Sequence, residues 1–379
     1  MSQTIYELPT PALLLDADIL DHNIRAMQEK ANKLSVSLRP HIKTHKCLEI
    51  AKKQKDAGAK GITVSTFYEA EQFAKAGYTD ITWAFPIPPV YIAPALDFNE
   101  KVTLRVVVDS MEAANLLEKT ARDKGKKIHV WLKVDCGYHR AGVDPKSPLA
   151  EDLVKTLSKA ESLHFDGILS HSGHAYHGKN RTEILKAAEE ERDVMMDFAE
   201  RMRKKRYDIL AVSIGSTPAM AVIQNLSGIK EIRPGNYAFY DYTQAMIGAC
   251  GVGDCALTVL SSVISHQPGA SHFLTDAGAL ALSKDMGPTH VSNDMDMGIL
   301  YDDYERKRLQ PHIHLRTLSQ EHGKVIANSP DMIEGKYKVG DKVRILEHHS
   351  CLTAAQFDEY YVVKEDRVVD KWKILRGRS

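Results

Sequence analysis

Short runs of β-branched and other apolar residues alternate with longer amphipathic stretches between residues 10 and 245. This alternation is typical of parallel strands joined by crossover helices. Eight runs predict strands: Ser37–Ile42, Gly61–Ser65, Ile81–Phe85, Thr103–Val108, Ile128–Val134, Phe165–Leu169, Leu210–Ile214 and Glu231–Arg233. Helices are predicted between them at segments such as Leu20–Leu34, Phe67–Ala76, Ser110–Lys124 and Thr182–Lys204. Eight such units predict an α/β fold, a closed (β/α)8 barrel of the TIM type, over residues 10–248.

The pattern changes after Ala249, where short alternating runs are no longer separated by helical periods. These runs are Ala256–Ser265, His272–Thr275, Lys342–Leu346 and Tyr360–Lys364. They predict a mainly antiparallel β domain over residues 249–379. We expect the N-terminal residues 1–9 to belong to this domain as well. The polar stretch Asp285–Arg308 has no clear period, and we expect it to be a long loop of the kind that often carries function.

The charge balance limits the class of partner. Lys and Arg number 50 and Asp and Glu also number 50, so the chain has no basic excess for nucleic acid or a membrane surface. Small molecules are the expected ligands. The 5 scattered cysteines are a poor basis for a disulfide framework, and the sequence has neither a signal-like N-terminus nor a long apolar run. We therefore expect a cytoplasmic protein.

Lys43 follows the first predicted strand, within the segment Arg39–Lys46. In a parallel barrel the carboxyl ends of the strands form the rim on which active sites are built. A lysine at this rim is a candidate nucleophile. The alternative is that Lys43 or Lys46 only interacts with the helix that follows.

Two glycine turns follow the last two predicted strands, and loops at these positions frequently bind phosphate in such barrels. The first contains Gly215, Ser216 and Thr217, and the second contains Gly235 and Asn236. Backbone N–H groups at such turns can hold a phosphate, although each turn alone is better explained as an ordinary loop. A rim lysine together with two phosphate turns suits pyridoxal phosphate, which needs a Schiff-base lysine and a fixed anchor for its phosphate.

Two other strand ends carry residues that suit this coenzyme. His171 follows the sixth predicted strand and could stack on a pyridine ring, while Arg140 follows the fifth and could bond the phenolic oxygen. The alternative for His171 is a hydrogen-bonded rim histidine without a ligand.

His349 and Cys351 lie in the β-rich half of the sequence. Alternate residues of an extended segment share a face, so this pair would present an imidazole and a thiolate together, which zinc favours. Two protein ligands leave positions open, as a catalytic metal requires. A satisfied core pair is the alternative explanation.

Seven segments together resemble one known family, over nearly the whole chain. They are Leu8–Ala12, Arg39–Thr44, Trp131–Gly137, Ser213–Pro218, Pro234–Asp241, Gln320–Gly323 and His349–Cys351. The chain resembles the fold-type III pyridoxal-phosphate enzymes that act on D-3-hydroxy amino acids. This group contains D-serine dehydratases of the eukaryotic type, D-threo-3-hydroxyaspartate dehydratases and D-threonine aldolases.

The resemblance implies a zinc- and pyridoxal-phosphate-dependent lyase, expected to be a homodimer. Lys43 would hold the coenzyme, Tyr176 would lie near the pyridine nitrogen, and His349 with Cys351 would bind zinc beside the substrate. The expected reaction is β-elimination from D-serine, or from a D-3-hydroxyaspartate-like substrate, to an oxo acid and ammonia.

Other functions of the same barrel stay open. The His-x-Cys pattern favours elimination, whereas an aldolase that releases glycine and an aldehyde is the alternative, since His174 and His177 offer an extra base near Tyr176. A non-catalytic coenzyme-binding protein would need no metal, and a racemase would need a second base instead.

Overall fold

The computed structural model describes residues 3–377 and divides the chain into two compact units. We call residues 26–235 with 377 the barrel unit, and residues 3–25 with 236–376 the β unit. The first division falls inside helix α1 (Ala17–Lys33) and the second follows Gly235. These boundaries differ from the expected ranges 10–248 and 249–379.

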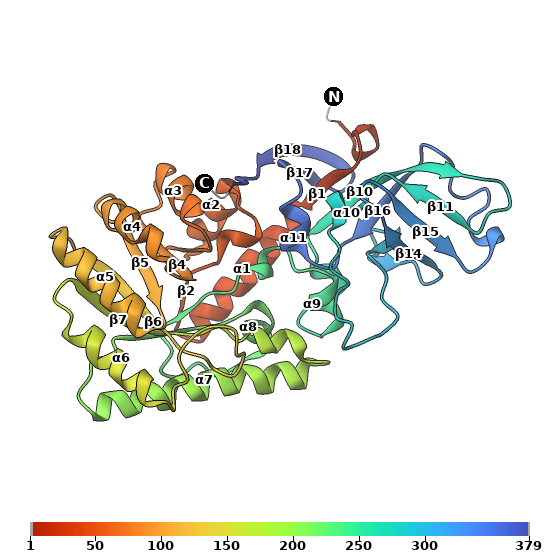
Figure 1. Ribbon diagram of the computed structural model, residues 1–379. Helices are drawn as coiled ribbons and strands as arrows, with labels where there is room; N and C mark the ends of the chain where they lie inside the picture. The colour runs from red at the N-terminus through yellow and green to blue at the C-terminus, as the bar shows by residue number, and fades with distance from the viewer. Residues whose placement is uncertain (1–2, 378–379) are drawn as a thin grey trace. The chain divides into compact units, whose positions relative to one another are not determined.

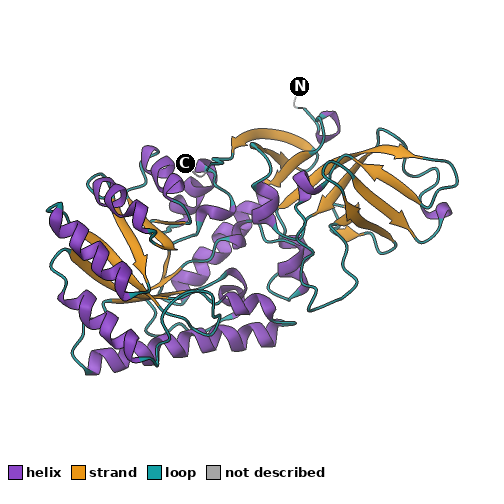
Figure 2. Ribbon diagram, viewed as in Figure 1, coloured by secondary structure: helices purple, strands orange, loops and turns teal. Residues whose placement is uncertain are grey.

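The barrel unit contains one parallel sheet of eight strands (Figure 1). The strands are β2 (Ser37–Leu38), β3 (Ile62–Val64), β4 (Asp80–Pro86), β5 (Thr103–Val108), β6 (Ile128–Lys133), β7 (Leu163–Leu169), β8 (Ala211–Ile214) and β9 (Glu231–Ile232). The helices are α2 (Leu48–Ala57), α3 (Phe67–Lys75), α4 (Ile92–Phe98), α5 (Met111–Asp123), α6 (Pro148–Lys159), α7 (Arg181–Lys204) and α8 (Thr217–Val222). Figure 2 shows helices flanking this sheet. The eight predicted strands are confirmed, with shifted ends.

Hydrogen bonds connect the two edges of the sheet, whose order is β2-β9-β8-β7-β6-β5-β4-β3. The Thr63 N–H of β3 donates to the Pro40 carbonyl after β2 at 2.9 Å. The guanidinium of Arg39 bonds Glu231 of β9 at 2.6 Å and Asp80 of β4 at 2.8 Å. These bonds close the sheet, so the carboxyl ends of its strands lie on one rim.

Helix α7 illustrates why the predicted helices form. Its N-cap residue Asn180 accepts a hydrogen bond from the Glu183 N–H at 3.0 Å, which satisfies one free donor of the first turn. Ile184, Ala188 and Met195 follow at helical spacing on its buried face. Glu191 lies on this same face and is therefore buried with them.

The β unit contains the mainly antiparallel sheet. Its strands are β1 (Ala12–Asp16), β10 (Leu257–His266), β11 (His272–Thr275), β12 (Ile299–Asp303), β13 (Arg308–Leu309), β14 (Ile313–Leu318), β15 (Gly323–Ala327), β16 (Lys342–Leu346), β17 (Glu359–Lys364) and β18 (Arg367–Lys373). Short helices α9 (Tyr242–Met246), α10 (Ala279–Leu282) and α11 (Ser350–Ala354) lie between them. The four predicted strands correspond to β10, β11, β16 and β17.

Two features of the β unit differ from the sequence expectations. Strand β1 pairs with β10 and β17, so this early segment belongs to the antiparallel sheet and not to the barrel. The expected single loop Asp285–Arg308 is wrong in its second half, which contains β12. Ile299 and Leu300 of β12 pair with Leu346 and Ile345 of β16, and this long-range pairing overrides a local sequence that shows no alternation.

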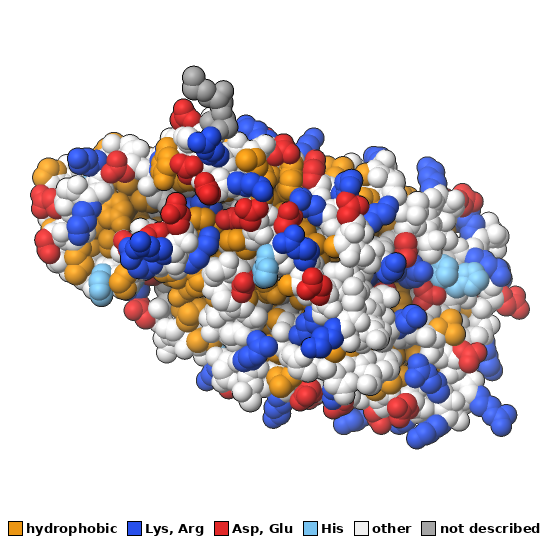
Figure 3. Space-filling model, turned by 180° about the vertical axis from the view of Figure 1, so that it is seen from behind, with side chains coloured by type: hydrophobic (Ala, Val, Ile, Leu, Met, Phe, Trp, Pro, Cys, Tyr) orange, Lys and Arg blue, Asp and Glu red, His pale blue; other side chains and the backbone are white. Residues whose placement is uncertain are grey.

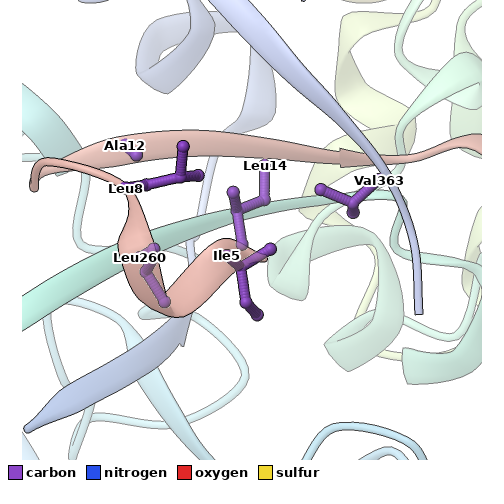
Figure 4. Close-up of a cluster of buried hydrophobic side chains, with 6 residues drawn as sticks. All are labelled: Ile5, Leu8, Ala12, Leu14, Leu260 and Val363. Atoms are coloured by element: carbon purple, nitrogen blue, oxygen red, sulfur yellow. The ribbon is translucent and has the colours of Figure 1, made fainter. Parts of the chain in front are cut away.

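Within the β unit, the N-terminal segment packs against strands of the sheet through a cluster of apolar side chains (Figure 4). Ile5 and Leu8 contact Leu14, Leu260 and Val363, and all five are buried. Burying such a side chain contributes roughly 1.5–3 kcal/mol. This cluster holds the N-terminal residues on the sheet.

The molecular surface carries both signs of charge. On the face seen in Figure 3, basic and acidic side chains are interspersed. Over residues 3–377, no helix has the length and apolar character needed to cross a membrane.

Candidate active site

Lys43 lies in the short helix η2 (Ile42–Thr44), directly after β2 at the rim of the barrel. Its side chain is exposed. The neighbouring Lys46 is partly buried and lies 3.7 Å from the buried carboxylate of Glu69. The structure therefore gives the two lysines different environments, and Lys43 is the one at the open rim.

Cationic side chains surround His171 in the barrel unit. The His171 ring bonds the Gly215 carbonyl through Nδ1 at 3.2 Å. Burial, followed by the positive charges of Lys133, Lys43 and Arg140, lowers the pKa of His171 well below its usual value. The structure thus brings together the predicted residues Lys43, Arg140 and His171, with His171 as a neutral ring.

Arg233 adds a fully buried cation to the same region. Its guanidinium donates to the Ser213 hydroxyl and to the Ser170 carbonyl. Burial lowers the pKa of Arg233 to about 10. Burial, Lys43 and then Arg233 lower the pKa of His41 well below its usual value, so this second histidine is also neutral.

Lys133 and Glu191 are buried charged residues that the sequence analysis did not identify. The Glu191 carboxylate accepts hydrogen bonds from the hydroxyls of Ser170 at 2.7 Å and Ser172 at 2.6 Å, and from the Gly215 N–H at 3.3 Å. Burial and the charge of Arg233 lower the pKa of Lys133 to about 7. A lysine inside an apolar strand and a glutamate on the apolar face of a helix were the signals in the sequence.

The first phosphate turn differs from its expected geometry at one residue. The Gly215 N–H is bonded to Glu191, so the expectation that this group would point at a phosphate is wrong. The Ser216 and Gly235 N–H groups have no acceptor within the described residues. Thr217 begins α8. The Ser216 and Gly235 N–H groups are donors that this unit offers to a phosphate.

Tyr176 lies on the short helix η4 (Gly173–His177), which follows β7. The ring of Tyr138 packs beside this segment, with its centroid 6.3 Å from that of His171. The Arg140 guanidinium lies 5.0 Å from the Tyr138 ring. Both ring nitrogens of His174 are buried and lack a partner among residues 3–377. The two rim loops are therefore packed together.

Asn236 belongs to the β unit. The predicted phosphate contact involves its backbone N–H, whereas its side chain makes contacts that the sequence did not predict. Its Nδ2 donates to Asp241 at 2.7 Å and to the Ser350 hydroxyl at 2.8 Å, and lies 3.9 Å from the Cys351 sulfur. Burial raises the pKa of Asp241, while Asn236 and the Ser350 N–H oppose the rise. Asn236 thus ties the segment after the barrel to the predicted metal pair.

The structure brings His349 and Cys351 together, but not on an extended segment as predicted. His349 is the N-cap residue of α11 and Cys351 lies in its first turn, so helical winding brings the side chains together. The His349 Nδ1 lies 2.8 Å from the Asp285 carboxylate. Burial opposes protonation, yet hydrogen bonds to Asp285 and Cys351 raise the pKa of His349 to about 11.

The donor set suits a metal with open coordination positions. A metal that displaces the Nε2 proton of His349 would find this nitrogen and the adjacent thiolate as its two ligands, while Nδ1 stays bonded to Asp285. Across the described part of the chain, no three His, Cys, Asp or Glu residues are grouped as a metal site. A metal here would therefore have two protein ligands. Asp285 was missed because nothing in a polar stretch marks one carboxylate among several.

Comparisons with known proteins agree with this fold. The family model for the alanine racemase N-terminal domain matches residues 15–243, and that for a putative serine dehydratase domain matches residues 256–363. D-Serine dehydratase from Dictyostelium discoideum is 38% identical, with 97% of each chain covered.

Two solved structures are also similar. D-threo-3-hydroxyaspartate dehydratase from Delftia sp. HT23 has a TM-score of 0.94 and 36% identity, covering 99% of this chain and 100% of its own. A cysteine-to-alanine variant of an enzyme of that name has been solved in a metal-free form. D-Threonine aldolase from Filomicrobium marinum has a TM-score of 0.87 and 26% identity, covering 99% and 97%.

Proposed function

The chain belongs to the family of fold-type III lyases that includes D-serine dehydratase and D-threo-3-hydroxyaspartate dehydratase, and from this premise we propose that it eliminates the β-hydroxyl group of a D-3-hydroxy amino acid. The products are an oxo acid and ammonia. The observation that carries the proposal is the pair of cations Lys43 and Arg140, together with the buried amine of Lys133, around the neutral ring of His171.

This group fits an anionic pyridine coenzyme. Several positive charges near the part-buried ring of His171 raise the free energy of the folded state unless an anion binds among them. Bound pyridoxal phosphate would supply an aldehyde for the substrate amine and a ring that delocalises the charge left at Cα. Lys43 would hold it through Nζ, and the free N–H groups of Ser216 and Gly235 would bind its phosphate.

Different residues of the barrel unit would transfer the proton and orient the coenzyme ring. The exposed Lys43 amine, once free, takes the Cα proton at Nζ. His171 stays neutral and is held by the Gly215 carbonyl, so it can pack against a ring without adding charge. Tyr176, on the loop that follows His171, is proposed to lie near the pyridine nitrogen, and Arg140 near the phenolic oxygen.

We assign the metal to His349 and Cys351, and zinc is the metal proposed. A bound zinc ion would supply a Lewis acid for the departing hydroxide. Imidazole and thiolate are ligands that zinc prefers, and the carboxylate behind His349 is the usual partner of a metal-binding imidazole. A relative's structure, a cysteine-to-alanine variant, is described as a metal-free form, which supports a metal in this family.

Retro-aldol cleavage is the second candidate. The buried, unpartnered ring nitrogens of His174 favour it, since a base near the β-hydroxyl is what an aldolase needs. The higher identity to dehydratases favours elimination.

Product analysis tests the proposal. Metal-loaded holoenzyme is incubated with D-serine, D-threo-3-hydroxyaspartate and D-threonine, with L-serine as the control substrate. Elimination gives pyruvate, oxaloacetate and 2-oxobutanoate, whereas cleavage of D-threonine gives glycine and acetaldehyde. Glycine as the main product from D-threonine, without any oxo acid from the other substrates, would replace elimination by the aldol reaction.

We also propose that the protein is a cytoplasmic homodimer. None of the five cysteines, all within the described residues, forms a disulfide bond, which supports a reducing compartment. Light scattering during size-exclusion chromatography measures the mass, and about 42 kDa instead of twice that value would contradict the dimer.

A further inference from the structure

Two consecutive histidines attach the polar segment 285–296 to the segment that carries the predicted metal ligands. The His349 Nδ1 lies 2.8 Å from Asp285 Oδ2, and the His348 Nε2 lies 2.6 Å from the Asp296 carbonyl oxygen. The two ends of the polar segment are thus bonded to neighbouring residues of the β unit. The expected functional loop has a structural connection to the candidate metal site.

From this contact we propose that Asp285 is a positioning residue that makes Nε2 of His349 the metal-binding atom. The inference rests on the proposed metal site. A neutral imidazole carries one proton, which can reside on either nitrogen. When a metal displaces the Nε2 proton, a carboxylate that accepts from Nδ1 keeps the remaining proton there, so Nε2 offers its lone pair to the metal and the ring cannot rotate freely.

The surrounding contacts hold Asp285 in place without a metal. Its Oδ1 accepts the Gly287 N–H at 3.0 Å, while its own N–H donates to the Ser283 hydroxyl at 3.2 Å. Gly287 has a φ of +70°, and a Cβ there would lie 2.6 Å from the His348 ring. Only glycine therefore fits between the carboxylate and the second histidine.

Asp285 acts through His349 and does not complete the metal site itself. Within the part of the chain that the structure describes, Asp285, His349 and Cys351 do not form a group of three possible ligands. The carboxylate also has both oxygens engaged, one by Gly287 and one by His349. Its negative charge makes the ring a stronger electron donor, which should raise metal affinity.

Zinc affinity tests this role without using enzyme activity. The holoenzyme is titrated with a chelator of known zinc affinity, and zinc is measured in the protein. Loss of a carboxylate partner of a ligating histidine typically costs about 10–100-fold in affinity, and we expect this loss for Asp285→Ala. Asp285→Asn keeps an acceptor oxygen but removes the charge, so it should lie between Asp285→Ala and the wild type.

Asp294→Ala is the matched control, because Asp294 lies in the same segment but forms an exposed ion pair with Arg316. Its zinc affinity should equal that of the wild type. Replacing zinc with cobalt adds a spectroscopic measurement. The sulfur-to-cobalt absorption band should persist in Asp285→Asn at higher cobalt concentration, since Cys351 is unchanged.

The outcomes separate this inference from the proposed function. If wild-type protein binds no zinc, the proposed metal site fails. If the wild type binds zinc and both Asp285 variants bind it equally well, the metal site stands and the positioning role is refuted. If Asp285→Ala does not fold, the zinc affinity of Asp285→Asn tests the positioning role alone. A zinc affinity equal to that of the wild type would then refute this role.

Discussion

Lys133 provides a direct test of the electrostatics of the barrel unit in its coenzyme-free form. The side chain is 7% exposed. Burial and the charge of Arg233 lower its pKa from 10.5 to about 7, although Cys136 and Glu191 act in the opposite direction. In the unfolded chain the amine is in water and keeps its ordinary pKa. Lys133→Met removes the titrating group and keeps a flexible apolar side chain.

The sign and size of the effect follow from proton binding. Between pH 7 and 10.5 the unfolded state binds one proton that the native state does not, so the free energy of unfolding rises with pH. One proton over one pH unit corresponds to about 1.4 kcal/mol. Between pH 7.5 and 9.5 the Lys133 contribution should rise by about 2.5 kcal/mol, and Lys133→Met should lose this rise.

Urea unfolding followed by tryptophan fluorescence measures this difference. A Trp372→Phe background leaves Trp83 and Trp131, which both belong to the barrel unit. The exposed Lys155, replaced by Met, is the control, and its pH dependence should match the wild type. If the curves of Lys133→Met and its parent run parallel from pH 7.5 to 9.5, Lys133 is already protonated in the native state and the argument fails.

Four further predictions concern the candidate site. Lys43→Ala should lose covalent coenzyme binding and nearly all activity, while Lys46→Ala keeps both; borohydride labelling of Lys46 by peptide mapping would refute the assignment. Gly215→Val, at a φ of +116°, should weaken pyridoxal-phosphate affinity at least tenfold in an equilibrium titration, and an unchanged affinity in folded protein would contradict it. Glu191→Ala removes the acceptor of three buried donors and should lower the free energy of unfolding by about 3 kcal/mol; a loss under 1 kcal/mol in urea unfolding would refute the network. Cys351→Ala should lose zinc and turnover of D-serine but keep the coenzyme absorption, and wild-type turnover by verified metal-free protein would exclude metal-assisted elimination.

The barrel strands and most of the rim residues could be predicted because their signals are local. A strand of a parallel sheet is a short apolar run, and residues that follow such runs lie on the same rim once the sheet closes. Lys43, Arg140 and His171 were found in this way, since each follows a different strand. The glycines of the two turns were also visible, although the hydrogen bond from Gly215 to Glu191 was not.

The sequence by itself determined the alternation of strands and helices, the change to antiparallel texture, and the lysine and turns at the rim. Only the tertiary structure decided that β1 joins the antiparallel sheet and that helical winding brings His349 and Cys351 together. It also decided that the side-chain amide of Asn236 lies near the sulfur of Cys351. The tertiary structure also decided which polar groups distant in the chain interact, as for Asp285 with His349 and Glu191 with Ser170. Periodicity is a property of neighbouring residues and can be seen in the sequence, whereas strand pairing and buried hydrogen bonds depend on partners distant in the chain.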